Sequence, residues 1–178
     1  IGMTSGLWYA EFELTDATTE GVVGISETPG YDAYDSRWIG EGADDWGYAS
    51  SDGNMYNNNA GTSFGDTYTT GDIIGVYLDL DAYKMYWAKN GTLQDSGTGK
   101  SLTAGLTYFF SCSDFSTAAS TWSTNFGNGF FGTTAVTSAV ADEGGIGAFE
   151  YDPSAGSFDS SSKDFRALCT KNMATYGG

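Results

Sequence analysis

Apolar and polar residues alternate with a period of two in the first part of this chain. Between positions 8 and 14 the even positions are apolar, whereas the odd positions hold Tyr9, Glu11 and Glu13. Successive side chains of a β-strand point to opposite faces of a sheet, so this pattern predicts a strand. One face of that strand is expected in a core and the other in water.

The same alternation recurs further along the chain, between turns that are rich in glycine. Residues 74–80 repeat the pattern, and residues 83–87 follow after a two-residue connection, so the two segments are predicted to pair as a hairpin. Asn90-Gly91 then supplies a tight turn. Further strands are predicted at residues 21–26, 106–112, 121–126 and 165–169. Short strands with regular turn signals are typical of an antiparallel β-sandwich.

The rest of the composition agrees with an all-β fold in one domain. The chain has 178 residues, of which 26 are glycine and 2 are proline. The most helix-like stretch, residues 134–143, is expected to form at most a turn or two of helix. No boundary divides residues 1–178, and residues 132–164 predict a loop-rich insertion within the single domain.

The chain ends and the cysteines carry less information. Neither an initiator methionine nor a signal region stands at Ile1, which predicts a fragment of a longer chain. Cys112 and Cys169 match no zinc or redox spacing. One disulfide and two buried free thiols both remain open as interpretations.

Charge excludes several function classes. The chain has 23 acidic residues, 7 basic residues and no histidine, for a formal net charge of −16. Binding to a nucleic-acid backbone or to an anionic lipid surface needs cations that this chain lacks. No apolar run approaches the ~20 residues that span a bilayer. Without histidine, Ser-His-Asp and Cys-His hydrolases and histidine-containing zinc sites are excluded.

Several motifs together resemble the SPRY (B30.2-like) domain family. Residues 5–12 read Ser-Gly-Leu-Trp-Tyr-Ala-Glu-Phe, like the opening signature of that family, and residues 46–53 contain its Trp-Gly-Tyr and Asp-Gly pieces. The most specific match is Gly-Asp-Ile-Ile-Gly at 71–75 followed by Lys-Asn-Gly at 89–91. Asn-Phe-Gly at 125–127 completes the order. The resemblance implies a concanavalin A-like jelly roll that acts as a binding module and not as an enzyme.

The end of the chain narrows the resemblance. Phe-Glu-Tyr at 149–151 and the segment 167–173 are similar to the ends of SPRY-like domains in tail-fibre and other virion proteins of bacteriophages. This resemblance implies a structural protein of the virion, located in the extracellular particle. A fibre setting would also imply a homo-oligomer of the chain.

Aromatic residues among the acids of residues 27–56 are the candidate ligand-binding residues. Flat rings beside hydrogen-bonding groups serve both sugar recognition and protein hot spots. The candidates are Tyr31, Tyr34, Trp38, Trp46, Tyr48 and Tyr56. The alternative for Trp46 and Tyr48 is a place in the core of a strand, whereas residues 31–38 are expected in a loop. The amides of residues 57–59 are expected to form turns.

The same acidic region offers oxygen ligands for calcium, which takes six to eight of them. The candidate metal ligands are Asp32, Asp35, Asp44 and Asp45. The alternative is a solvated acidic surface, and no other cofactor is expected. Paired carboxylates such as Glu11 and Glu13 also suit a glycosidase, but the outer face of a strand ordinarily carries glutamate because it meets water. We therefore expect no enzyme.

The sequence thus predicts a noncatalytic binding or structural module of a phage virion protein, in a tail fibre or a surface decoration. Its expected partners are a host-surface glycan or protein, or neighbouring virion subunits. The alternative is a cellular SPRY adaptor or a lectin-like protein that binds a peptide or a sugar. No nucleic acid and no membrane insertion are expected.

Overall fold

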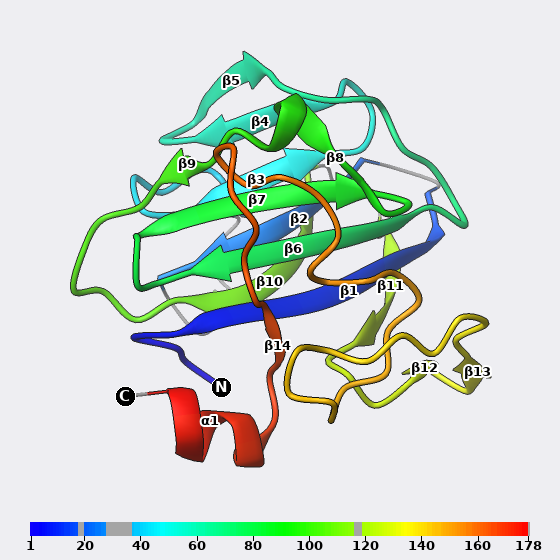
Figure 1. The fold of residues 1–178 in the computed structure, drawn as a ribbon. Coiled ribbons are helices and arrows are strands. Elements are labelled where there is room, and N and C mark those ends of the chain that lie inside the picture. Colours follow the sequence, from blue (N-terminus) through cyan, green and yellow to red (C-terminus); the bar gives the residue numbers. More distant parts are fainter. Residues whose placement is uncertain (18–19, 28–36, 116–118, 178) are drawn as a thin grey trace.

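Two antiparallel sheets face each other in the computed structural model of this chain, which describes residues 1–17, 20–27, 37–115 and 119–177 (Figure 1). The all-β sandwich predicted from the sequence is confirmed. Residues 31, 32, 34 and 35, which include two of the candidate aromatics and two of the candidate metal ligands, lie outside the described residues.

The first sheet has seven strands and contains the N-terminal strand near one edge. In spatial order its strands are β11 (Thr121–Asn125), β1 (Leu7–Asp16), β6 (Ile73–Asp79), β7 (Lys84–Lys89) and β8 (Thr92–Leu93), with β14 (Arg166–Ala167) parallel to β1 and β9 (Lys100–Ser101) beside β7. Strand β1 pairs with β6 along most of its length, and Leu7, its first residue, lies opposite Asp79.

The second sheet has five strands and forms the other layer of the sandwich. Its order is β10 (Phe109–Asp114), β2 (Gly21–Ser26), β3 (Trp46–Ala49), β4 (Asn54–Asn57) and β5 (Ala60–Ser63). A small separate hairpin joins β12 (Phe130–Phe131) to β13 (Thr134–Ala135), and the described helices are the 3-10 turn η1 (Gln94–Gly97) and α1 (Thr170–Tyr176).

The main core lies between the two sheets, where the predicted alternation places it. Trp8, Phe12 and Leu14 of β1 are buried there together with Trp87 of the same sheet and Val23 of the facing sheet. The indole N–H of Trp87 donates to the carbonyl oxygen of Val23 at 3.1 Å, which links the first sheet to the second. These strands therefore meet through the apolar half of their period-two pattern.

A second core covers the opposite face of the seven-stranded sheet, which corrects the prediction that this face meets water. Tyr9 and Glu11 are both fully buried, because the C-terminal segment crosses the sheet (Figure 1). The second core consists of Tyr9, Tyr77, Tyr86, Ala88, Phe149, Phe158, Phe165 and Ala167. The sheet is thus buried on both faces, and the loop-rich residues 132–164 contribute two of the three phenylalanines.

Two predicted turns are confirmed by their backbone angles. Asn90 and Gly91 have φ of 47° and 77° between β7 and β8, as a two-residue hairpin turn requires. Asn58 and Asn59 have φ of 51° and 58° between β4 and β5, so these amides form a turn. Asparagine tolerates this left-handed region better than most residues.

Residues 134–143, which were expected to form at most a turn or two of helix, contain strand β13 and irregular chain. The α-helix α1 lies instead at 170–176, directly after the predicted last strand, which is only the two residues of β14. Both cysteines are free thiols, with Cys112 exposed and Cys169 half-buried. Cys112 is therefore not the buried thiol that one interpretation placed there.

Candidate functional site

Three aromatic side chains gather on the outer face of the five-stranded sheet, near strands β2 and β4. The Trp38 ring lies 5.1 Å from the ring of Tyr56 and 4.3 Å from that of Phe115, in edge-to-face contacts. The Tyr56 and Phe115 rings are 5.3 Å apart. All three side chains are half-buried, so each ring offers part of its surface to solvent. We call these three residues the aromatic triad.

The triad packs on a small apolar base formed by strands β2 and β3 and by the segment that precedes β3. Val22, Ile39 and Ala49 are buried beneath it. Ile39 approaches the sheet closely because Gly47 has no side chain, and a Cβ at Gly47 would lie 2.3 Å from the carbonyl oxygen of Ile39. Close backbone approach is a common reason for glycine inside a strand. The absence of a side chain at Gly47 therefore allows the segment that holds Trp38 and Ile39 to pack closely on the sheet.

A polar network holds the Tyr56 hydroxyl at the rim of the triad. That hydroxyl donates to Asp52 Oδ2 at 2.7 Å, and the Asn54 side-chain amide donates to the same oxygen at 2.8 Å. Donation to the Asp52 carboxylate raises the pKa of Tyr56 above its ordinary value. The rim thus combines a ring, a phenol and a carboxylate.

The candidate metal ligands within the described residues make contacts with protein groups. Asp44 accepts a hydrogen bond from the Thr103 hydroxyl. Asp45 is buried, accepts from the backbone N–H of Glu27 at 3.3 Å, and lies 3.9 Å from the Arg37 guanidinium. In the part of the chain that the structure describes, no group of three or more metal-binding side chains occurs.

The structure separates the candidate aromatics into two sets. Trp38 and Tyr56 come together in the triad, whereas Tyr48 is fully buried in the main core and Trp46 packs against that core. This placement removes Tyr48 from the candidate surface, because its ring faces the other sheet and contacts Trp87 and Phe64. Phe115 was not predicted, since the sequence gives no sign that a residue following β10 lies beside residues 38 and 56.

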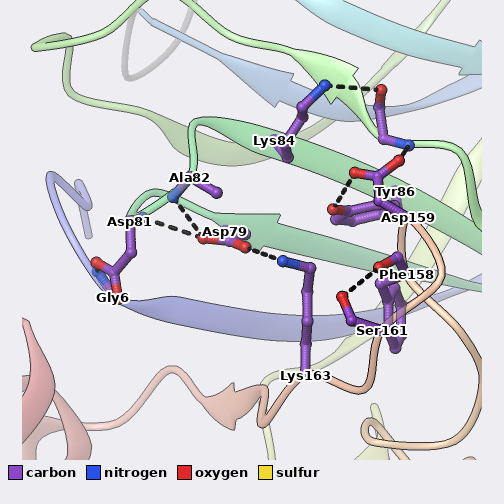
Figure 2. Close-up of polar contacts among 11 residues, drawn as sticks. Gly6, Asp79, Asp81, Ala82, Lys84, Tyr86, Phe158, Asp159, Ser161 and Lys163 are labelled. Atoms are coloured by element: carbon purple, nitrogen blue, oxygen red, sulfur yellow. Dashed lines mark hydrogen bonds and ion pairs between the residues drawn. The ribbon is translucent and has the colours of Figure 1, made fainter.

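Acids of the seven-stranded sheet and of the C-terminal segment attach that segment to the sheet. Figure 2 shows Lys163 reaching Asp79, with their atoms 2.7 Å apart, and Asp159 accepting from the Tyr86 hydroxyl at 2.8 Å. The backbone N–H of Gly99 donates to the second oxygen of Asp159 at 2.9 Å and lowers the pKa of that carboxyl. The carboxylates of Asp79 and Asp159 thus have their ion pair and hydrogen bonds with groups of this chain.

The carboxylate of Glu11 likewise accepts hydrogen bonds from the chain itself, which corrects the prediction that Glu11 faces water. Its carboxylate accepts from the backbone N–H of Glu150 and Tyr151 at 3.0 and 2.8 Å, and from the Asn125 amide at 3.0 Å. Burial raises the pKa of Glu11, although these donors oppose the rise. A fully buried carboxyl that the chain itself surrounds is poorly placed to act on a bound sugar.

The two facing, mostly antiparallel sheets place this chain in the class of all-β sandwich proteins. The sequence model of the SPRY domain matches residues 7–129, and the chain therefore belongs to the SPRY domain family. This finding confirms the resemblance seen in the sequence. SPRY domains are protein-interaction modules and not a family of enzymes.

Known proteins similar to this chain support the same assignment. Ran-binding protein 9 of Xenopus tropicalis is 32% identical over 93 residues, which are 51% of this chain and 17% of the relative. The Ran-binding proteins 9/10 homolog of Drosophila melanogaster is 30% identical over 92 residues, 51% of this chain and 10% of that relative. The chain thus matches less than a fifth of the length of either relative.

A solved structure supports the fold. The crystal structure of the SPRY domain of human HERC1 superposes with a TM-score of 0.55 at 23% identity, covering 68% of this chain and 75% of that one. No helix within the described residues is long and apolar enough to cross a membrane.

Proposed function

We propose that this chain is a protein-binding module that holds a segment of a partner protein against the aromatic triad. The observation that carries the proposal is the half-exposed packing of Trp38, Tyr56 and Phe115 on a rigid sheet. Aromatic side chains fixed by their neighbours bind with little loss of conformational entropy and dominate the binding energy of interfaces. The family assignment supports a protein partner over a glycan.

The surroundings of the triad favour a cationic or hydrogen-bond-donating partner segment. Asp52 accepts from the Tyr56 hydroxyl, the backbone N–H of Glu41 donates to the Trp38 carbonyl at 3.2 Å, and the chain as a whole carries a formal charge of −16. Complementary charge mainly accelerates encounter and rejects wrong partners. We expect the apolar part of the partner to contact the rings and its polar groups to meet Asp52.

The cellular adaptor is the setting that the comparisons support better. The relatives named above are animal proteins, and their names state that they bind Ran. Ran is therefore one defined partner to test, although the matched region is a small part of each relative. The virion setting stays a prediction from the resemblance of residues 149–151 and 167–173, and mass spectrometry of purified particles would test it.

A displayed library of random peptides, selected on the immobilised chain, tests the proposal together with purified Ran. Affinities of the selected peptides are then measured by fluorescence anisotropy for the unchanged chain, Trp38→Ala and Tyr56→Ala. We expect each substitution to weaken binding roughly 10- to 30-fold, the effect of removing an interface hot spot. The matched control is Phe130→Ala, because Phe130 is an exposed aromatic on the separate β12–β13 hairpin.

A glycan array with the same variants decides between the partner classes. Glycan binding that Trp38→Ala abolishes, without any peptide or Ran binding, would overturn the protein-binding proposal in favour of a lectin. Peptide binding that all three variants retain would show that the aromatic triad is not the binding surface.

A further inference from the structure

The strand β10 is the edge strand of the five-stranded sheet, and one of its sides carries no neighbouring strand among the described residues. On its inner side it pairs with β2, from Phe109 opposite Ser26 to Asp114 opposite Gly21. The outer side of an edge strand presents N–H and C=O groups that another strand can bind.

The hydrogen-bond pattern shows which residues of β10 face inward. Just after the strand, the Phe115 N–H donates to the Glu20 carbonyl at 2.9 Å, so this pair is hydrogen-bonded across the ladder. Hydrogen-bonded pairs alternate along an antiparallel ladder. Residues 109, 111 and 113 therefore direct their backbone groups to β2, and residues 110, 112 and 114 direct theirs outward.

The outer edge is already used at one position. Tyr108 has the same parity as the outward residues, and its N–H and C=O exchange hydrogen bonds of 3.0 and 2.9 Å with Met3. This antiparallel bridge shows that a chain running along the outer side of β10 finds the correct geometry for strand pairing. Beyond it, the outward groups of Phe110, Cys112 and Asp114 continue the same edge.

An apolar cavity of about 350 Å³ opens beside this edge, between the two sheets. Its lining consists of Ile1, Phe109, Phe110, Phe126 and Leu168. The Phe110 and Phe126 rings lie 6.2 Å apart, and both contact Phe12 of the main core. An apolar group that enters the cavity would therefore extend the core itself, and the volume lies at the small end of the range for ligand pockets.

The sequence of β10 does not protect its edge. Natural edge strands are usually blocked by lysine, by proline or by a bulge. In contrast, β10 reads Phe-Phe-Ser-Cys-Ser-Asp, pairs with β2 in continuous register, and carries a single charge at its end. An edge in continuous register, with a single charge at its end and an apolar cavity beside it, is suited to a partner strand with one apolar anchor.

The net charge of this chain indicates which kind of partner strand can bind to the edge of β10. A second copy of the chain would bring another formal charge of −16 to the contact, and the two molecules would repel each other. Four of the seven cationic side chains, Arg37, Lys89, Lys100 and Lys163, are already paired with aspartates, so few remain to bind an acidic partner. Lys171 on α1 is an exposed cation near Leu168 in sequence, but the acidic excess outweighs it.

We propose that β10 binds an extended basic segment of another protein as an added antiparallel or parallel strand, with one apolar side chain of that segment in the cavity. The main-chain groups of residues 110, 112 and 114 supply the pairing, and the phenylalanines supply the anchor site. The cavity shares no lining residue with the triad, although Phe115 of the triad directly follows Asp114, and the proposal does not depend on the function proposed above.

The test uses a labelled nine-residue peptide in which lysine alternates with apolar residues and leucine is central. Binding is measured by fluorescence anisotropy against three matched peptides: one with central glycine, one with glutamate for lysine, and one N-methylated on the residues that face β10. We expect the parent peptide to bind at least about tenfold more tightly than the glycine and the N-methylated forms. The glutamate form is expected not to bind.

A protein variant isolates the backbone contribution. Cys112→Pro removes an outward N–H and leaves the ladder to β2 intact, because Cys112 does not bond to β2, and proline is tolerated on such edges. Cys112→Val keeps the N–H and is the matched control. We expect the proline variant to bind the peptide about tenfold more weakly than the valine variant, with both melting within a few degrees of the unchanged chain.

Three results would overturn the proposal. They are equal binding of the leucine, glycine and N-methylated peptides; absence of binding by the parent peptide; and a concentration-dependent dimer of the free chain that Cys112→Pro dissociates. Because Trp38→Ala is expected to leave peptide binding at β10 unchanged, failure at this edge is distinguishable from failure at the aromatic triad. If Cys112→Pro does not fold, the N-methylated peptide alone still decides.

Discussion

At the level of single residues, the buried carboxylates are where the sequence was least informative. Glu11 was expected in water because it occupies the polar half of a period-two pattern. Its carboxylate instead accepts backbone N–H groups that lie 139 and 140 positions away in the chain. A local pattern reports which residues share a face, but not whether a distant segment covers that face.

Burial raises and hydrogen bonds lower the pKa of a carboxyl, and burial prevails in Glu11 whereas hydrogen bonds prevail in Asp142. Burial by itself would raise the pKa of this carboxyl, but the N–H groups of Ile146, Ala167 and Gly147 and the Asn172 amide outweigh it, so the pKa is lowered. Asp142 thereby connects the turn at 142–147 to β14 and α1. The Asp142 carboxylate therefore holds three parts of the C-terminal segment together.

We expect Asp142→Asn to lower the free energy of unfolding at pH 7 by roughly 2–4 kcal/mol. The reason is that one amide oxygen replaces two oxygens that accept four hydrogen bonds, and the new NH2 group faces donors. Urea unfolding monitored by tryptophan fluorescence gives the measurement. A loss below about 0.5 kcal/mol, the size of an ordinary surface change, would contradict this account.

The pH dependence of the same residue follows from the sign of its pKa shift. The pKa of folded Asp142 is below its unfolded value, so its contribution is present above about pH 4 and is lost as the pH falls through the folded pKa. We expect the unfolding free energies of the unchanged chain and of Asp142→Asn to converge below pH 4. Parallel curves from pH 7 to pH 2.5 would show that the carboxylate is not the source of the difference.

At the level of elements, the sequence predicted the strands that have strong alternation and missed those that lack it. The strand predicted at 21–26 is β2, and β1, β6 and β7 differ from their predicted ranges by one or two residues. In contrast, β5 reads Ala-Gly-Thr-Ser and is exposed throughout, so no apolar pattern marks it. Its pairing depends on the turn at Asn58-Asn59 and on the neighbouring strand β4.

The segment that holds Trp38 depends on one glycine of strand β3. A Cβ at Gly47 would lie 2.3 Å from the Ile39 carbonyl oxygen and 2.5 Å from Val22 Cγ1. We expect Gly47→Ala to displace residues 37–40 and to cost roughly 1–3 kcal/mol, the usual cost of overpacking. Chemical denaturation measures the cost, and the affinity of peptides selected on the aromatic triad is expected to fall as well.

A second glycine provides the control for that prediction. Gly105 also lies outside the main core but has open space around its Cβ position, with a φ of 82°. Gly105→Ala therefore carries backbone strain without a steric clash, and it should leave the affinity at the triad unchanged. Equal loss of affinity in both variants would mean that Gly47 does not position Trp38.

At the level of the whole molecule, the sequence located part of the candidate site but not its composition. It identified Trp38 and Tyr56 as surface aromatics, and it left open that Trp46 and Tyr48 belong to the core. Phe115 was missed because only the tertiary structure brings its ring against those of Trp38 and Tyr56, which stand 77 and 59 positions earlier in the sequence. The charge of −16, in contrast, is a property of composition and needs no fold.

That charge predicts how stability depends on salt. Acidic residues exceed basic residues by 23 to 7, so the folded chain repels itself, and added salt screens this repulsion. The screening length falls from about 10 Å at 0.1 M to about 3 Å at 1 M. We therefore expect the melting temperature in calorimetry to rise by a few degrees over this range of sodium chloride.

Calcium chloride at matched ionic strength separates screening from a bound ion. A rise that equals the sodium chloride value would indicate screening alone. A larger rise that a chelator abolishes would support the predicted calcium site at Asp32, Asp35, Asp44 and Asp45. A fall in melting temperature with sodium chloride would contradict the assumption that repulsion among the acids limits stability.

The family match ends at residue 129, but the physical core of this protein does not. A chain cut after residue 129 loses Phe149, Phe158 and Phe165 and exposes the sheet face of Tyr9 and Tyr77. Burial of one such side chain is worth about 1.5–3 kcal/mol, so the three phenylalanines together approach the 5–15 kcal/mol that stabilises a typical domain. We expect residues 1–129 to bind a hydrophobic dye and to lack a cooperative melting transition, and we expect residues 130–178, added as a separate chain, to restore it. A cooperative transition of residues 1–129 at the melting temperature of the full chain would show instead that the C-terminal segment is dispensable for the sandwich.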